Sequence, residues 1–135
     1  MKKFNQFSFI LLILLSLCGG GGITTAFATH ISQPIVTDPK TQYAVGETVI
    51  LRGWVNYNEQ ATPDVLLNFK VTRPDGSVAL DRSYPSNAEG WFEFEFDTKN
   101  ERPGTYRIAI TSHCLEIHRY ACTYKNQTVS IQLHR

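Results

Sequence analysis

Residues 90–97 read Gly-Trp-Phe-Glu-Phe-Glu-Phe-Asp and form the most regular period-two pattern in this 135-residue chain. Successive side chains of a β-strand point to opposite sides of a sheet. The three phenylalanines therefore share one face, and the tryptophan and two glutamates share the other. Three aromatic rings on one face require an apolar layer opposite them. The rest of the chain must supply strands that cover this face.

Much of the chain after residue 28 divides into short alternating segments separated by turn residues such as Pro103-Gly104. No apolar period of 3.6 residues persists through three helical turns. This pattern predicts an all-β fold, a seven-stranded antiparallel immunoglobulin-like sandwich. Pro34 and Pro39 limit the first strand to a sheet edge, because proline cannot donate to a ladder. The expected strands are 31–37, 49–57, 65–71, 78–83, 90–97, 106–111 and 128–133.

The first 28 residues have the zones of a secretory signal peptide: two lysines, an apolar run over residues 7–17, and the small-x-small pattern of residues 26–28. The apolar run is shorter than the about 20 residues that a transmembrane helix needs. We expect cleavage after Ala28, with an uncleaved N-terminal anchor as the alternative. Residues 29–42 are then an N-terminal segment with a possible edge strand, and residues 43–135 form the sandwich domain.

Cys18 raises a second possibility, because it ends the apolar run as the lipidated cysteine of a bacterial lipoprotein signal does. The residue before that cysteine is normally Gly, Ala or Ser, whereas here it is Leu17. We therefore favour cleavage after Ala28 over a lipid anchor at Cys18.

Cleavage after Ala28 removes two of the 13 Lys+Arg residues and none of the 12 Asp+Glu residues, leaving a net charge of −1. Such a chain is not basic enough to bind nucleic acid or an anionic membrane surface. The remaining 107 residues are enough for one domain. The expected location is secreted or periplasmic.

Four short motifs resemble macroglobulin-type and related bacterial immunoglobulin-like domains over about residues 43–133. The resemblance implies a fold. It does not imply the thioester chemistry of full-length macroglobulins, which has no counterpart in this sequence. The motifs are Tyr43-x-x-Gly46-Glu47-x-Val49, Pro74-Asp75-Gly76, Gly90-x-Phe92-x-Phe94 and Pro103-Gly104-x-Tyr106.

Cys114 and Cys122 remain after signal removal, and in an exported chain they are expected to form a disulfide. The alternative is a metal site made by these cysteines with His118 between them and His113 nearby. The two possibilities exclude each other. A helix would place the two Cα atoms about 12 Å apart, and a disulfide needs them within about 7 Å. We predict the disulfide, and neither a metal nor a cofactor.

The outward side chains of residues 49–57 and 90–97 form the second candidate site. If these strands are antiparallel neighbours, one register gives a phenylalanine ring space beside a glycine and also pairs opposite charges and two indoles. Side by side on a sheet, the indoles would form a binding platform; alternatively, they cover each other or lie under the N-terminal segment. The expected pairs are Gly53–Phe92, Arg52–Glu93 and Trp54–Trp91.

No nucleophile elbow, metalloprotease helix or phosphate-binding glycine loop occurs in the sequence. We therefore expect a non-enzymatic exported module with a structural or protein-interaction role. Its contacts would come from sheet faces, from the first and last strands as free edges, or from the Cys114–Cys122 loop. The alternative is carbohydrate or cell-wall binding through Trp54 and Trp91. The expected partner is an extracytoplasmic protein or glycan.

Overall fold

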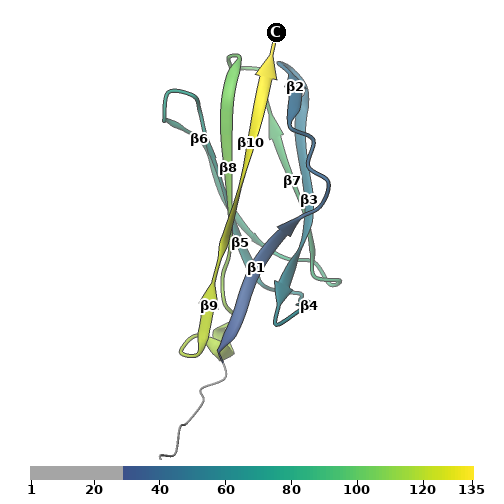
Figure 1. The fold of residues 1–135 in the computed structure, drawn as a ribbon, viewed down its shortest axis with the longest axis vertical. Helices are drawn as coiled ribbons and strands as arrows, with labels where there is room; N and C mark the ends of the chain where they lie inside the picture. The colour runs from purple at the N-terminus through teal and green to yellow at the C-terminus, as the bar shows by residue number, and fades with distance from the viewer. Residues whose placement is uncertain (1–28) are drawn as a thin grey trace, which may run out of the picture.

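Two five-stranded β-sheets pack face to face in the computed structural model, which describes residues 29–135 (Figure 1). Sheet A has the order β4-β3-β1-β9 with β7 also paired to β3, and sheet B has the order β2-β10-β8-β5-β6. The expected signal peptide, the cleavage after Ala28 and the possible lipid anchor at Cys18 lie outside the described residues. The elements are β1 (His30–Val36), β2 (Gln42–Ala44), β3 (Thr48–Tyr57), β4 (Gln60–Ala61), β5 (Leu66–Thr72), β6 (Val78–Pro85), β7 (Trp91–Asp97), β8 (Gly104–Ser112), the 3-10 turn η1 (Glu116–His118), β9 (Cys122–Tyr124) and β10 (Asn126–His134).

The phenylalanine face of β7 lies in the core, as its alternation predicts. Phe69 of β5 stacks on Phe94 with ring centroids 4.8 Å apart, and it meets Phe92 edge to face at 5.4 Å. Phe96 is also buried, 6.2 Å from Tyr106 of sheet B. Burial of a side chain of this size contributes about 1.5–3 kcal/mol. The two sheets are thus joined by aromatic packing between β7 and sheet B.

The β3–β7 register is the one predicted. Gly53 lies opposite Phe92, and Arg52–Glu93 and Trp54–Trp91 are the adjacent pairs. A Cβ atom at Gly53 would lie 2.6 Å from Cζ of Phe92 and closer still to the carbonyl oxygen of Ile35 on β1. Glycine is therefore required by both neighbouring strands, and the sequence argument identified only one of them.

The fold class is as predicted, but the strand count and the edges differ. The described chain has ten strands, three of which, β2, β4 and β9, are only two or three residues long. Two pairs, β1–β9 and β2–β10, are parallel. The expectation that the first and last strands are free edges was wrong, because β1 lies between β3 and β9 and β10 lies between β8 and β2.

Pro34 does not confine β1 to an edge because its missing N–H falls where no partner is needed. The N–H groups of His30 and Val36 point away from β3, toward the carbonyl of Ala121 and the side chain of Gln127. The nitrogen of Pro34 points the same way, since alternate residues of a strand point alike. The β9 pairing ends at Ser32, so no ladder bond is lost.

The start of β8 carries a feature typical of immunoglobulin-like folds. The hydroxyl of buried Tyr106 donates to the carbonyl oxygen of Arg102, four residues earlier, at 2.8 Å. This contact is the tyrosine corner of β-sandwiches. Burial, followed by the bond to Glu101, raises the pKa of Tyr106. Arg73 forms two hydrogen bonds to the Glu101 carboxylate, at 2.9 and 3.1 Å.

Candidate binding surfaces

The outer face of sheet A presents a row of apolar side chains across three strands. Trp54 of β3 lies between Ile35 of β1 and Trp91 of β7 in the sheet register. Residues directly opposite on one face of an antiparallel pair have Cβ atoms about 4.5–5.5 Å apart. Trp91 is 42% exposed, and Trp54 is half-buried beside β1. We call the surface of Ile35, Trp54, Trp91, Arg52 and Glu93 the tryptophan face.

The two indoles are neighbours but do not cover each other. Within residues 29–135, neither Trp54 nor Trp91 belongs to a stacked or edge-on aromatic pair. Nor does either indole N–H donate a hydrogen bond to another described residue. An indole N–H is a donor without acceptor capacity.

An ion pair lies next to the tryptophans. Nε of Arg52 donates to the carboxylate of Glu93 at 2.7 Å. This hydrogen bond raises the pKa of Arg52 and lowers that of Glu93. Both groups are exposed, so the pair adds little to folding stability. Its effect is to hold two charged side chains in place beside the aromatic row.

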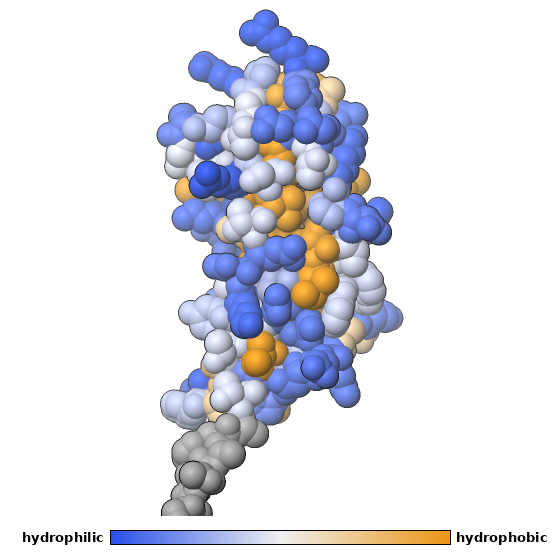
Figure 2. Space-filling model, in the orientation of Figure 1, coloured by the Kyte–Doolittle hydropathy of each residue, from blue (hydrophilic) through white to orange (hydrophobic). Residues whose placement is uncertain are grey.

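On the face shown in Figure 2, separate apolar patches lie among hydrophilic residues in a row along the long axis of the molecule. Among residues 29–135, eight large hydrophobic residues are exposed. Isolated exposed apolar side chains are ordinary in soluble proteins, so only gathered ones need explanation. Of the exposed ones, Ile117 and Tyr120 lie in the loop that joins β8 to β9, and Trp91 belongs to the tryptophan face. The eight are Ile31, Ile50, Leu66, Val78, Trp91, Ile117, Tyr120 and Tyr124.

The loop from β8 to β9 is closed by a disulfide between Cys114 and Cys122, whose Cα atoms are 6.0 Å apart. The disulfide prediction is confirmed, and the alternative metal site is excluded because both sulfurs are bonded to each other. Among residues 29–135, no three His, Cys, Asp or Glu side chains are grouped so that they could hold a metal ion. His113 instead packs against Tyr124 at 5.5 Å.

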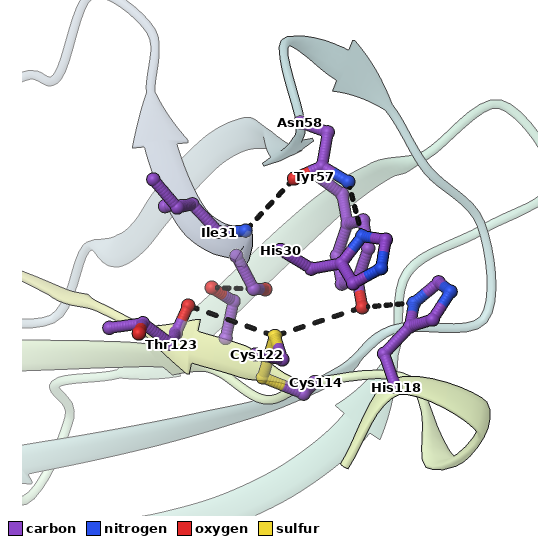
Figure 3. The surroundings of a disulfide bond; sticks show 10 residues. His30, Ile31, Tyr57, Asn58, Cys114, His118, Cys122 and Thr123 are labelled. Atoms are coloured by element: carbon purple, nitrogen blue, oxygen red, sulfur yellow. Dashed lines mark hydrogen bonds between the residues drawn. A yellow bond between two sulfur atoms is a disulfide. The ribbon is translucent and has the colours of Figure 1, made fainter. Parts of the chain in front are cut away.

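Two histidines and a tyrosine surround this disulfide (Figure 3). The rings of His30 on β1 and His118 on η1 stack with centroids 3.7 Å apart. The hydroxyl of Tyr57 lies 2.6 Å from Nδ1 of His118 and 3.7 Å from Sγ of Cys122. Asn58 reaches Nδ1 of His30 at 2.6 Å. The cluster attaches the loop to the end of sheet A.

The tip of this loop carries the two large hydrophobic side chains that are most exposed within residues 29–135. Ile117 is 83% exposed and Tyr120 is 89% exposed. The guanidinium of Arg119 lies 4.7 Å from the centroid of the Tyr120 ring. Side chains this exposed bury little apolar surface in the fold, so the tip is a second candidate contact surface.

Sequence reasoning placed every residue of the tryptophan face except Ile35, and it missed the cluster at the disulfide. The Ile35 contact depends on β1 entering the sheet beside β3. His30 and His118, which stack, are 88 positions apart in the sequence, and no local sequence pattern predicts their contact. The tyrosine corner could have been found, because Tyr106 follows Pro103-Gly104 at the start of a predicted strand.

Comparisons with known proteins support the fold. No protein-family model matches the chain, and no curated protein matches it either. Among solved structures, a Salmonella alpha-2-macroglobulin mutant matches with a TM-score of 0.57 and 21% identity, over 77% of this chain and 6% of the macroglobulin. A beta-glucosidase from Listeria innocua in complex with glucose matches with a TM-score of 0.51 and 7% identity, over 76% of this chain and 16% of the enzyme.

A third match is the CARDB domain of a Pyrococcus furiosus protein in complex with metal ions. Its TM-score is 0.45 at 13% identity, and it covers 81% of this chain and 97% of that domain. The chain spans only small parts of the macroglobulin and the enzyme. At these identities the likeness concerns the fold, which is a macroglobulin-like immunoglobulin-type β-sandwich.

Proposed function

We propose that this macroglobulin-like immunoglobulin-type sandwich is an exported, non-enzymatic binding module whose tryptophan face binds a polysaccharide outside the cytoplasm. The observation that carries the proposal is the pair Trp54–Trp91, adjacent across two strands, unstacked, and with both indole N–H groups unbonded within residues 29–135. The C–H faces of sugar rings are apolar, so they stack on flat aromatic surfaces, and indole N–H groups can bond their hydroxyls.

Polar groups beside the indoles suit the same ligand. The ion pair of Arg52 and Glu93 offers both donors and acceptors at the edge of the aromatic row. Binding sites for small molecules combine aromatic surface with a few placed polar groups in this way. An open sheet face lacks the enclosed carboxyl pair that glycoside hydrolysis requires, so the proposal assigns binding without catalysis.

Export is supported by the disulfide and by the sequence before residue 29. Disulfides persist in oxidising compartments and are rare in the reducing cytosol. No helix within residues 29–135 has the length and apolar character to cross a bilayer. Mass spectrometry of the protein recovered from outside the cytoplasm should find Thr29 as the first residue, and a lipid on Cys18 would contradict this part of the proposal.

Co-sedimentation with insoluble polysaccharides, including purified cell wall, cellulose and chitin, tests the binding role. We expect Trp91→Ala to lower retention on the bound polysaccharide by at least about tenfold, because truncation of a central aromatic contact commonly costs about 2 kcal/mol. Tyr120→Ala is the matched control, since it removes a more exposed ring from another surface. Retention that is unchanged in Trp54→Ala and Trp91→Ala would contradict the proposal.

A protein-interaction role through the loop tip is a second candidate, favoured by the exposure of Ile117 and Tyr120. Tyrosine and arginine are enriched in binding hot spots, and Arg119 lies against Tyr120 here. A photo-crosslinking residue at position 120 should then capture one defined partner in the intact host envelope. The same residue at position 75, in an exposed turn on another part of the surface, should not capture it. Equal capture from both positions would contradict this candidate.

A further inference from the structure

We propose that a polar hollow beside the tryptophan face is a second subsite, and that it selects sugars carrying an acetamido group, the N-acetylhexosamines. This inference rests on the proposed polysaccharide binding and names the class of sugar. The hollow has a volume of about 390 Å³ and is lined by Ile31, Gln33, Asn56, Asn58, Glu59 and Lys125.

The hollow continues the tryptophan face along the strands. Gln33 and Asn56 are a cross-strand pair, just as Ile35 and Trp54 are. Gln33 lies two residues before Ile35 and Asn56 two residues after Trp54, on the same outer face. Two residues of strand advance about 6.6 Å, a distance of the order of one sugar unit. When the sugar chain runs along the strands, a unit stacked on Trp54 has its neighbour over Gln33 and Asn56.

The amides of the hollow differ in what they can offer a ligand. Oδ1 of Asn56 accepts from the N–H of Glu59 at 2.7 Å, which leaves its NH₂ group unbonded within the described chain. The Gln33 amide makes no hydrogen bond to residues 29–135. Both ends of the Asn58 amide are already hydrogen-bonded, its oxygen to the N–H of Ile31 and its nitrogen to His30. Asn58 therefore lines the wall of the hollow. An acetamido group needs a donor for its carbonyl and an acceptor for its N–H, and Gln33 supplies both.

Charge and exposed apolar surface narrow the ligand further. Glu59 and Lys125 carry opposite charges, which cancel, so the hollow has no net charge. The hollow as a whole therefore has no net attraction for a uronic acid or for a cationic amino sugar. Ile31 is 42% exposed at the same place, which provides apolar contact for the acetyl methyl. A neutral N-acetylated sugar satisfies all of these groups.

Isothermal titration calorimetry with two matched oligosaccharides tests the inference on the purified protein, produced from the full-length sequence. Chitotetraose and cellotetraose share length and linkage and differ only in the acetamido group at C2. We expect chitotetraose to bind at least about fivefold more tightly, the effect of one additional well-formed hydrogen bond. Chitosan tetraose, which carries free amines, should lose this advantage.

Substitutions test whether the preference for chitotetraose over cellotetraose depends on the hollow. Gln33→Ala should reduce the preference for chitotetraose to below about twofold and leave cellotetraose binding unchanged, and Trp91→Ala should weaken both. Gln132→Ala removes the same kind of side chain from β10 in sheet B and should change neither. Circular dichroism melting checks that each variant folds.

Equal binding of the two oligosaccharides, with dependence on Trp91, would overturn this inference and leave the proposed function standing. A preference for chitotetraose that survives in Gln33→Ala would also overturn it. If neither oligosaccharide binds, the inference fails, and tryptophan-dependent co-sedimentation with the other polysaccharides decides the proposed function separately.

Discussion

The sandwich core and the loop between β8 and β9 are held together by different forces. In the core, alternate side chains of β3, β5, β7, β8 and β10 are buried, including Phe94 of β7, which is 1% exposed. In the loop no residue of η1 is buried. Its shape depends on the Cys114–Cys122 bond and on the stack of His30 and His118. Stability should therefore be distributed unevenly, with local opening of the loop possible while the core stays folded.

Removal of a core ring should have the largest effect on stability. Phe94→Ala is expected to lower the free energy of unfolding by about 3–5 kcal/mol, because it deletes buried contacts and leaves a cavity beside Phe69. Urea unfolding followed by tryptophan fluorescence measures the loss. Trp91→Ala on the opposite face of the same strand is the control and should cost about 1 kcal/mol or less. Similar losses in the two variants would contradict the assignment of the faces.

Removal of the disulfide should cost less and act locally. The double variant Cys114→Ser, Cys122→Ser is expected to lose about 2–3 kcal/mol, because the unfolded chain regains the freedom of a short closed loop. Amide hydrogen exchange should accelerate over residues 113–125 while β7 (Trp91–Asp97) keeps its protection. Uniform acceleration across both would show that the loop and the core open together.

Loss of the histidine stack should have a smaller effect in the same place. His118→Ala removes the ring that lies against His30 and the partner of the Tyr57 hydroxyl. We expect a loss of about 1 kcal/mol, the sum of a modest aromatic contact and one hydrogen bond. His113→Ala is the matched control, because His113 only tilts against exposed Tyr124. Equal effects of the two substitutions would contradict the role of the stack.

The smallest effect on stability should come from the ion pair of Arg73 and Glu101, which lies at the end of the sandwich remote from the β8–β9 loop. This effect should depend on pH. The hydrogen bonds from Arg73, followed by one from Tyr106, lower the pKa of Glu101 below its ordinary value of 4.5. The unfolded chain then binds more protons at acid pH than the folded chain. The stabilisation from this ion pair is therefore fully present at pH values above the ordinary pKa of Glu101. It is lost as the pH falls through the lowered pKa of Glu101 in the folded chain.

Arg73→Ala should consequently flatten the acid side of the stability profile below about pH 5. The loop should not contribute to this slope, so Arg119→Ala, which breaks an exposed ion pair with Glu116, serves as the control. Thermal melting between about pH 3 and 7 provides the comparison. An unchanged slope in Arg73→Ala would show that the Glu101 bonds do not persist in solution.

Alternation in the sequence was enough to predict which side chains form the core. The alternate apolar positions of the expected strands 49–57, 65–71, 90–97, 106–111 and 128–133 are buried: Val49, Leu51, Val55, Tyr57, Val65, Leu67, Phe69, Val71, Phe92, Phe94, Phe96, Tyr106, Ile108, Ile110, Val129, Ile131 and Leu133. A shift of one residue would turn all of them toward solvent. The pairing of Arg52 with Glu93 followed from the same reasoning, because cross-strand charges and the space at Gly53 favour one register.

The short strands and the loop could not be predicted in this way. β9 has three residues and pairs with β1, which lies about 90 positions earlier in the chain. A segment this short has no period of its own, so only the partner strand determines that it is extended. The same limit applies to the hollow at Gln33 and Asn56, which exists because β1 enters sheet A beside β3.

The sequence by itself determined the two faces of β3, β5, β7, β8 and β10, because alternation is a local pattern. It also determined the β3–β7 register, which follows from the position of Gly53 and the opposite charges, and the disulfide, since only two cysteines follow residue 28. Tertiary structure alone decided where β1 and β10 lie, which strands are edges, and what surrounds the disulfide. Those features depend on contacts between distant residues, such as Ser32 with Ser112 across the two sheets at 2.9 Å. Such contacts stabilise the protein only after folding has brought these distant segments together.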